Sequence, residues 1–229
     1  SAFGSGALDM NTAADQAGSY EGITIPVTTP NTSKEALQVS LNTYCHVLKD
    51  RYLSLALFPA GFATSWYLSE FAAADYAAAK ELGISVYEYL NNAVAALGSD
   101  PTGIYYVPHL VGACNPSNDI CATGTVIGIT PHSSRHKLYK AIYEGIAYEF
   151  QIVTSILDQY AGHFNQVKIS GGGGKARFAL DLRASIANKT MLQLQCDEAG
   201  CLGAAMLAGL ATGVYTSEED AVQKAVHVI

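Results

Sequence analysis

The chain has 229 residues, of which 49% are hydrophobic and only 14% charged, and its formal net charge is −7. This apolar fraction excludes intrinsic disorder. The 21 glycines follow no period and the cysteines number only 5, which excludes collagen-like and disulfide-scaffold proteins. The acidic balance, without a visible basic face, argues against nucleic-acid binding.

The sequence gives no indication of a membrane span or of export. It contains no apolar run of about 18 residues, and no basic segment followed by an apolar stretch stands at its beginning. The 5 cysteines are an odd number and form no CxxC pair, a pattern typical of reduced thiols. We therefore expect a cytoplasmic protein that binds neither membranes nor nucleic acids.

Helices follow strands along the first half of the chain. The sequence predicts a Gly-rich turn, an Ala-rich stretch, and then a strand at residues 22–27, where β-branched residues are enriched. A second strand is predicted at residues 52–58. A helix is predicted at residues 64–82, ended by Gly83, and another at residues 86–97.

The second half continues in the same alternation. Its loop at residues 112–124 is longer than most connections inside a compact domain, and loops of this kind are usually functional or mobile. The alternation predicts an α/β fold, and the lack of a linker or repeat predicts one domain over residues 1–229. The predicted elements are strands at residues 104–108, 167–169 and 191–195, and helices at residues 137–160, 175–188, 200–213 and 217–227.

The most informative segment is the run of four glycines at residues 171–174, between a predicted strand and a predicted helix. Glycine in a regular element costs about 0.5–1 kcal/mol relative to alanine, so the run indicates a positive-φ turn or a closely approaching ligand. The N–H groups at the following helix start favour a phosphate or a polar ligand edge. A turn that only packs the helix on its strand is the alternative. The Walker pattern fails, because Ile169 stands where its first glycine belongs and Ala176 replaces Ser/Thr.

A dinucleotide-binding fingerprint is a competing interpretation of the same segment. Gly171-x-Gly173-x-x-Ala176 follows a predicted strand and opens a helix, and Asp197 lies about where a ribose-binding acid would be. Such a unit would bind NAD. However, these units usually open a domain, whereas this one lies near the C-terminus with one strand after it.

This segment and several others together resemble the C-terminal region of the FGGY family of carbohydrate kinases, which includes glycerol kinase and xylulokinase. Each motif alone is weakly specific, whereas their shared order along nearly the whole chain is specific. The matching segments are residues 18–21, 60–66, 105–116, 124–130, 141–147, 171–175, Glu198, 200–205 and 213–215.

The resemblance implies an actin-like, ribonuclease-H-like fold in which helices flank a mixed sheet. It also implies transfer of the γ-phosphoryl group of ATP to a sugar or polyol hydroxyl, with Mg²⁺. Backbone N–H groups in glycine-rich turns suit this chemistry, because phosphoryl transfer asks mainly for positioning and charge stabilisation. Carried over by motif, Gly18 and Ser19 would contact phosphate, Gly61 and Ser65 would line the nucleotide, and Gly172, Gly173 and Ala176 would border the adenine and ribose.

In this family the catalytic base is an aspartate in a GGxD segment that would precede residue 1, and an N-terminal domain holds most of the sugar. We therefore expect the C-terminal domain alone, with no catalytic residue, no metal ligand and no sugar kinase activity by itself. The identity of the sugar and a homodimeric assembly are left open. A non-catalytic actin-like interaction module is a further alternative.

Four positions depart from the family pattern. Ala113 and Cys114 replace a common Glu-Arg pair, and Thr123 replaces a frequent arginine. These departures put in doubt whether the loop at residues 112–124 closes on the family's usual ligand. Ser19 replaces a threonine and keeps its hydroxyl, which is a mild change.

Five other residues have ordinary interpretations. His109 is expected to be structural or to line a cleft. His132 and His136 are spaced like a metal pair, but no acid completes a ligand set, so we expect both at the surface. Cys114 and Cys121 have no assignable base, so we expect inert thiols.

Overall fold

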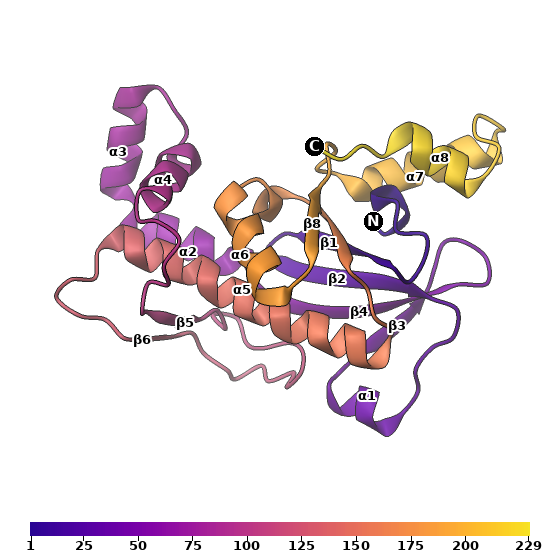
Figure 1. Ribbon diagram of the computed structural model, residues 1–229, viewed down its shortest axis with the longest axis horizontal. Coiled ribbons are helices and arrows are strands. Elements are labelled where there is room, and N and C mark those ends of the chain that lie inside the picture. Colours follow the sequence, from indigo (N-terminus) through magenta and orange to yellow (C-terminus); the bar gives the residue numbers. More distant parts are fainter.

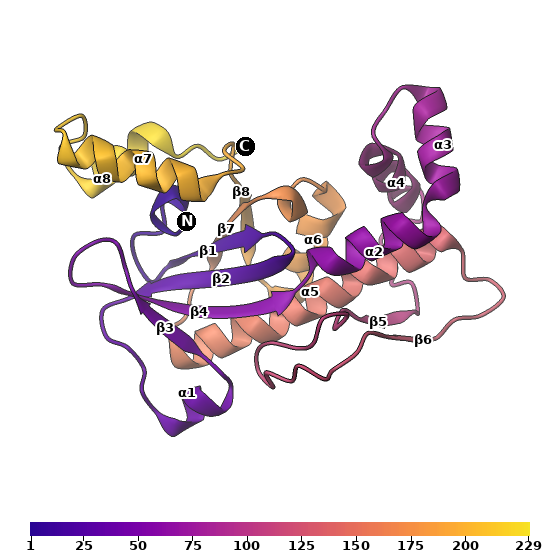
Figure 2. The ribbon, with the colours of Figure 1, turned by 180° about the vertical axis from the view of Figure 1, so that it is seen from behind.

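The computed structural model describes all residues, 1–229, and contains a six-stranded sheet of strand order β3-β4-β2-β1-β7-β8 (Figures 1 and 2). β2 pairs antiparallel with β1 and β4, and β3 pairs antiparallel with β4. β7 pairs parallel with both β1 and β8. The sheet is therefore mixed, as expected. Its strands are β1 (Thr12–Ala17), β2 (Tyr20–Val27), β3 (Asn42–Cys45), β4 (Tyr52–Pro59), β7 (Gln166–Ser170) and β8 (Thr190–Gln193).

Helices cover both faces of this sheet. The long α5 runs across one face beside α6, and α7 and α8 pack with the N-terminal turn η1 on the other side (Figure 1). α1 lies between β2 and β3, α2 to α4 follow β4, and β5 and β6 form a separate antiparallel ribbon. The elements are η1 (Phe3–Ser5), α1 (Lys34–Gln38), α2 (Gly61–Phe71), α3 (Ala73–Leu82), α4 (Val86–Ala95), β5 (Tyr105–Val107), β6 (Thr125–Ile127), α5 (Arg135–Tyr160), η2 (Gly172–Gly174), α6 (Arg177–Ala187), α7 (Ala199–Ala211) and α8 (Glu218–Ala225).

The main core lies between the sheet and α5. Ile23 and Ile25 of β2, Phe58 of β4, and Ile142 and Phe150 of α5 are completely buried in it. Burial of each such side chain contributes about 1.5–3 kcal/mol. This core fixes α5 against the middle of the sheet, so the strand ends that flank it keep fixed positions.

The central strand β1 was not predicted. Its sequence TAADQA lacks β-branched and aromatic residues apart from Thr12, so its local preference for a strand is weak. It nevertheless forms one, because β2 and β7 pair with it on both sides. Small side chains suit this place, since Ala13 and Ala14 pack under covering layers on opposite faces of the sheet.

The single helix predicted at residues 64–82 is wrong in its bounds and its continuity. α2 begins at Gly61, and the helix breaks at the completely buried Ala72, after which α3 points away from α2 (Figure 2). Gly83 ends α3 in a left-handed conformation with φ 68°, as predicted. α1, β3 and β6 were missed, and each is only 3 to 5 residues long.

The other predicted elements are confirmed to within a few residues. Ser217 caps α8 through its hydroxyl oxygen, which accepts a hydrogen bond of 3.1 Å from the N–H of Asp220. None of the helices combines the length and the apolar character that a membrane crossing would require.

Candidate functional site

Two backbone turns from distant parts of the sequence meet beside the carboxyl end of β1. Gly18 and Ser19 form the turn between β1 and β2. The N–H of Gly61, at the start of α2, donates to the carbonyls of Gly18 and Ser19 at 3.1 and 3.0 Å. The N–H of Ala60 also donates to the carbonyl of Ser19 at 3.0 Å. The structure thus brings Gly18, Ser19 and Gly61 together.

The glycine run after β7 forms a third turn at the same place. Gly171 has φ +91°, and a Cβ added there would lie 2.7 Å from the carbonyl oxygen of Ala17, the last residue of β1. A Cβ on Gly173 would lie 2.9 Å from the Cβ of Ala17. These two glycines are therefore required by close packing of the turn on β1, and the turn lies directly beside Gly18.

Gly172 has a different environment from its neighbours. A Cβ added to it would meet no atom within 4 Å, and its φ is not positive. The residue is exposed at the start of the short turn η2. The first N–H groups of a helical turn have no partner within that turn. Gly172 therefore presents backbone to open space, where a ligand could approach.

A completely buried charged cluster lies behind the turns. Arg183 of α6 forms a bidentate ion pair with Glu21 of β2, with Nε 3.0 Å from Oε1 and Nη2 2.7 Å from Oε2. Asp15 of β1 is 1% exposed, and neither of its carboxylate oxygens accepts a hydrogen bond from a neighbouring donor. Burial raises the pKa of Asp15 well above its usual range, Glu21 raises it further, and Arg183 opposes the rise.

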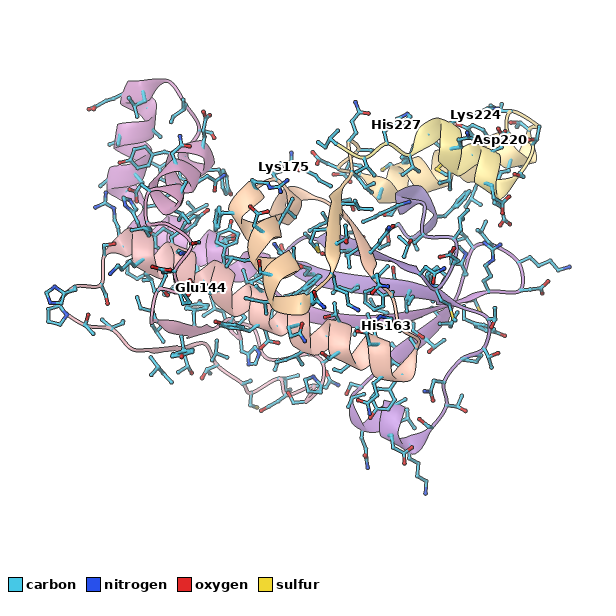
Figure 3. The ribbon with its side chains drawn as sticks, viewed as in Figure 1. Glu144, His163, Lys175, Asp220, Lys224 and His227 are labelled. Carbon is cyan, nitrogen blue, oxygen red and sulfur yellow. The ribbon has the colours of Figure 1, made fainter.

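One ion pair lies at the rim of the site. Lys175, at the start of α6, contacts Asp197 at 2.6 Å, and both side chains are largely exposed. Figure 3 labels Lys175 at this end of α6. Because the carboxylate of Asp197 is paired with Lys175, the structure gives no support to the predicted role of Asp197 as a ribose-binding acid.

The sheet topology also disagrees with the dinucleotide interpretation. A dinucleotide-binding domain is built on a mostly parallel sheet. The strands that flank the glycine run and α6, β7 and β8, do pair in parallel, but β1, β2, β4 and β3 form an antiparallel half of the same sheet. The sheet as a whole is therefore not that of a dinucleotide-binding domain.

Two predicted site residues stand apart from this cluster. The side chain of Ala176 is buried in the main core, so only its backbone could face a ligand. Ser65 lies one turn along α2 from Gly61 and is exposed. It lines a cavity of about 500 Å³ together with Leu68, Ser69, Ala73, Tyr76 and Tyr87.

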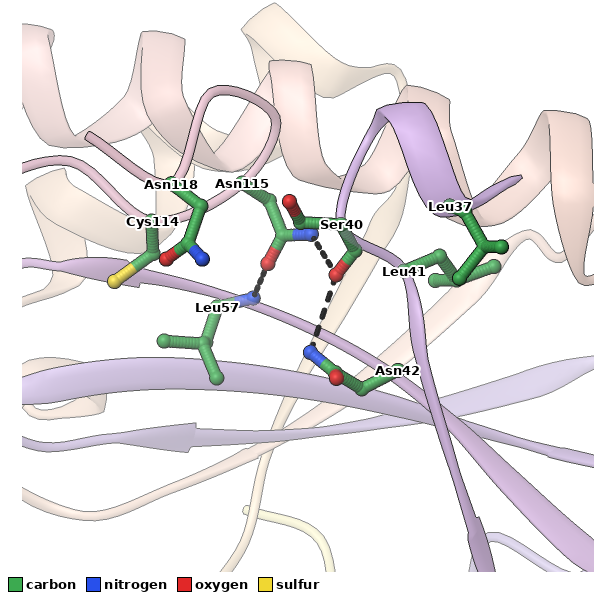
Figure 4. Close-up of a pocket in the computed structure, with 8 residues that line it drawn as sticks. All are labelled: Leu37, Ser40, Leu41, Asn42, Leu57, Cys114, Asn115 and Asn118. Atoms are coloured by element: carbon green, nitrogen blue, oxygen red, sulfur yellow. Dashed lines mark hydrogen bonds between the residues drawn. The ribbon is translucent and has the colours of Figure 1, made fainter. Parts of the chain in front are cut away.

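The loop that departs from the family pattern contacts β4, on the far side of β2 from β1. Asn115 bridges it to β4 and to the segment after α1 (Figure 4). Its side-chain oxygen accepts from the N–H of Leu57, and its amide donates to the carbonyls of Val39 and Ser40, each at 2.8 Å. Cys114 lines a pocket of about 260 Å³ beside it. The segment that contains Ala113 and Cys114 therefore lies beside β4, two strands away from β1 in the sheet.

The histidines and cysteines mostly follow their expected ordinary roles. His109 contacts Glu149 at 2.9 Å, and the pair is mostly buried. Burial, and then the Glu149 carboxylate, raises the pKa of Cys114, which agrees with an inert thiol. His136 lies only partly at the surface, because its Nε2 is 2.9 Å from the completely buried Asp75. No group of three or more His, Cys, Asp or Glu side chains could hold a metal ion.

Comparison with known proteins identifies similar sequences and folds. Residues 27–212 match the C-terminal domain of the FGGY family of carbohydrate kinases, a range that leaves out Gly18 and Ser19. The chain is 30% identical over 204 residues to the glycerol kinase of Pseudothermotoga lettingae, covering 87% of this chain and 39% of that protein. It is 26% identical over 190 residues to the xylulose kinase of Staphylococcus epidermidis, covering 82% and 36%.

Solved structures share the fold at lower sequence identity. Ligand-bound xylulose kinase from Lactobacillus acidophilus superposes with a TM-score of 0.82 at 22% identity, covering 100% of this chain and 44% of that one. The glycerol kinase of Plasmodium falciparum, solved with ADP, gives a TM-score of 0.77 at 21% identity, covering 95% and 42%. The chain thus spans less than half the length of these proteins.

Proposed function

The chain belongs to the FGGY family of carbohydrate kinases, and we propose on this basis that it forms the nucleotide-binding half of an ATP-dependent sugar or polyol kinase. The whole enzyme would transfer the γ-phosphoryl group of ATP to a substrate hydroxyl. In this proposal, residues 1–229 act as one domain that binds ATP and ADP, and a second domain holds most of the sugar.

The observation that carries this proposal is the meeting of three backbone turns beside the end of β1. Gly61 donates to both residues of the Gly18–Ser19 turn, and Gly171 and Gly173 pack against Ala17. Glycine-rich turns can present free backbone N–H groups to an anion without a charged side chain, although the N–H groups of Gly18 and Gly61 themselves donate to protein carbonyls. Phosphoryl transfer depends mainly on such positioning and charge stabilisation.

Each predicted residue then has a role that suits its surroundings. Gly18 and Ser19 would contact phosphate oxygens through the β1–β2 turn. Gly61 and Ser65 would line the nucleotide along α2, and Gly172 and Gly173 would border the adenine and ribose. The open space around Gly172 supports this placement. Ala176, whose side chain is in the core, would contribute through its backbone.

Magnesium is the ion that such a kinase would use, and it would neutralise charge on the phosphates. The structure brings together no group of three or more metal-ligating side chains. Mg²⁺ usually retains several waters and takes its remaining ligands from substrate phosphates and one or two carboxylates. We therefore assign no residue of this chain as a metal ligand.

The chain alone is proposed to bind nucleotide without phosphorylating a sugar. The two acids that flank the Gly18–Ser19 turn, Asp15 and Glu21, are each 1% exposed and cannot reach a substrate hydroxyl. A general base must lie within hydrogen-bonding distance of the proton that it removes. The base would then come from the other half of the enzyme.

Calorimetric titration of the purified chain with Mg-ADP tests the proposal, with NAD as a comparison ligand. We expect ADP binding in the wild type and its loss in Gly172→Val, because the added side chain would fill the ligand space. Gly200→Val is a matched control, since a Cβ there also meets no atom within 4 Å, and it should bind ADP normally. Binding of NAD, or no binding of ADP, would contradict the proposal, and silence toward both would favour an interaction module.

A further inference from the structure

A single buried ion pair connects two of the three turns. Glu21 is in β2, directly after the Gly18–Ser19 turn, and Arg183 is in α6, which follows the glycine run. Their side chains are 1% and 2% exposed. The bond from Nη2 to Oε2, at 2.7 Å, is as short as charge-assisted bonds usually are, and the bond from Nε to Oε1, at 3.0 Å, is slightly longer. The contact therefore fixes α6 relative to β2.

Arg183 also reaches the glycine run itself. Its Nη1 lies 3.5 Å from the carbonyl oxygen of Gly173 and 3.4 Å from that of Ala179. These are long hydrogen bonds, but the donor carries a full charge in a buried place. Gly173 in turn packs against Ala17, and Ala17 is the residue of β1 that stands opposite Glu21. A continuous set of contacts therefore lies behind the site: Gly173 packs on Ala17, Ala17 is paired with Glu21, and Glu21 binds Arg183.

Asp15, the third member of the cluster, decides how many negative charges face Arg183. Burial and the neighbouring Glu21 carboxylate both raise the pKa of Asp15, which favours its neutral form. One arginine charge then faces one glutamate charge. Replacing a buried ion pair by apolar residues of similar size is often neutral or stabilising. Stability alone is therefore a poor reason for this chain to bury three ionisable groups behind its glycine turns.

We propose that Glu21 and Arg183 are positioning residues that set the distance between the Gly18–Ser19 turn and the glycine run. The inference rests on the proposed function, in which phosphate contacts the first turn and adenosine borders the second. A ligand that spans both turns, such as ADP, needs them at a fixed separation. Adenosine contacts only the second turn and is much less sensitive to that separation.

The double variant Glu21→Met/Arg183→Met tests this role without leaving an unpaired buried charge. Its fold is checked by circular dichroism and thermal melting, and Mg-ADP and adenosine are titrated calorimetrically. We expect the Kd for ADP to rise about 10-fold or more, since small misplacements of binding groups are costly. The Kd for adenosine should change by less than about 3-fold, because each turn keeps its local structure.

Two further variants keep the test decisive if the double variant folds poorly. Glu21→Gln preserves the size of the side chain but removes its charge, and it should weaken ADP binding more than adenosine binding. Arg183→Lys keeps the charge but cannot bind both oxygens of Glu21, and its ADP affinity should be intermediate. Lys189→Met breaks an ion pair with Asp158 at the other end of the sheet and should leave ADP affinity within about 2-fold.

The outcomes separate this inference from the proposed function. A folded double variant, or a folded Glu21→Gln, that binds ADP as the wild type does would overturn the positioning role alone. Equal losses of ADP and adenosine affinity would also overturn it, because they would indicate general damage to the site. A wild type that binds no ADP would overturn the proposed function, and the positioning role with it.

Discussion

The two ends of the parallel strands β1, β7 and β8 are formed by different kinds of residues. At their carboxyl ends, the structure places glycine turns, and the charged side chains of Glu21 and Arg183 stand buried behind them. At their amino ends, the ammonium of Lys189 contacts both carboxylate oxygens of Asp158 at 2.7 and 2.8 Å. The same ammonium donates to the carbonyl of Phe164 and lies 4.1 Å from the centre of the aromatic ring of Phe164.

Under the proposed function, this difference separates the end of the strands that binds the nucleotide from the end that does not. The amino end is occupied by the side chains of Lys189 and Asp158. At the carboxyl end, Gly18, Ser19 and Gly172 are exposed. Gly172 is the clearest case, because a Cβ added there would meet no atom within 4 Å. Changes at the two ends should therefore have separable effects on stability and on ADP affinity.

The largest expected effect is on stability at the carboxyl end. Glu21→Ala would leave the guanidinium of Arg183 buried without its carboxylate. Removal of one partner of a buried ion pair costs about 3–5 kcal/mol. Urea denaturation followed by circular dichroism would measure the loss, and a loss below about 1 kcal/mol would show that the pair is not held as tightly as its geometry indicates.

A smaller loss is expected at the amino end. Lys189→Met removes an ammonium that serves one carboxylate and one carbonyl, and hydrogen bonds to charged groups contribute about 1.5–3 kcal/mol. Thermal unfolding would report the loss. This variant sharpens the comparison, because it should be destabilised while its ADP affinity is unchanged. A loss of ADP affinity here would show that the two ends are coupled.

The pH dependence of stability gives a further test of the carboxyl end. Asp15 has a raised pKa in the folded state, so the folded state holds a proton that the unfolded state releases as pH rises above about 4. Stability therefore falls with rising pH through this window. Asp15→Asn removes this term, because its amide does not titrate.

From pH 4 to pH 7, we expect the stability of Asp15→Asn to rise relative to the wild type, because only the wild type has a carboxyl here whose pKa is raised on folding. Urea denaturation at several pH values would measure this difference. Glu21, Arg183 and Tyr143 are the other titratable groups of this cluster, and all three remain in the variant. A stability difference that does not vary with pH would mean that Asp15 is not held protonated.

The smallest effect on stability is expected at Gly172. Gly172→Ala should change the free energy of unfolding by less than about 0.5 kcal/mol, as is usual for an unobstructed surface position. Gly171→Ala is the contrasting variant, since its φ is +91° and its Cβ would lie 2.7 Å from the carbonyl oxygen of Ala17. Thermal melting of the two variants should rank Gly171→Ala well below Gly172→Ala, and the reverse order would contradict the described turn.

Much of the fold, and part of the candidate site, could be predicted from the sequence. The alternation of elements predicted an α/β fold, and the run at residues 171–174 marked a turn between a strand and a helix, both of which the structure confirms. β1 escaped prediction because its strand state depends on pairing with β2 and β7 rather than on its own residues. The assignment of nucleotide contacts stays a prediction for all of its residues: Gly18, Ser19, Gly61, Ser65, Gly172, Gly173 and Ala176.

The buried cluster could not have been found from local pattern. Glu21 and Arg183 are 162 positions apart, and no periodicity relates them. Within its predicted helix, Arg183 has the appearance of an ordinary surface charge. Only the packing of α6 on the sheet shows that it is 2% exposed. The one available signal was indirect: Glu21 is the only charged residue of its strand and stands next to exposed turn residues.

The most direct test of nucleotide binding by these turns is amide chemical-shift mapping of the isotopically labelled chain during titration with Mg-ADP. We predict that the largest shifts occur at Gly18, Ser19, Gly61, Gly172 and Gly173, at the carboxyl end of β1. Thr190 and Phe164, at the amino end, should hardly change. Saturable shifts centred on another surface, or none at any ADP concentration, would contradict the claim that these backbone turns bind the nucleotide.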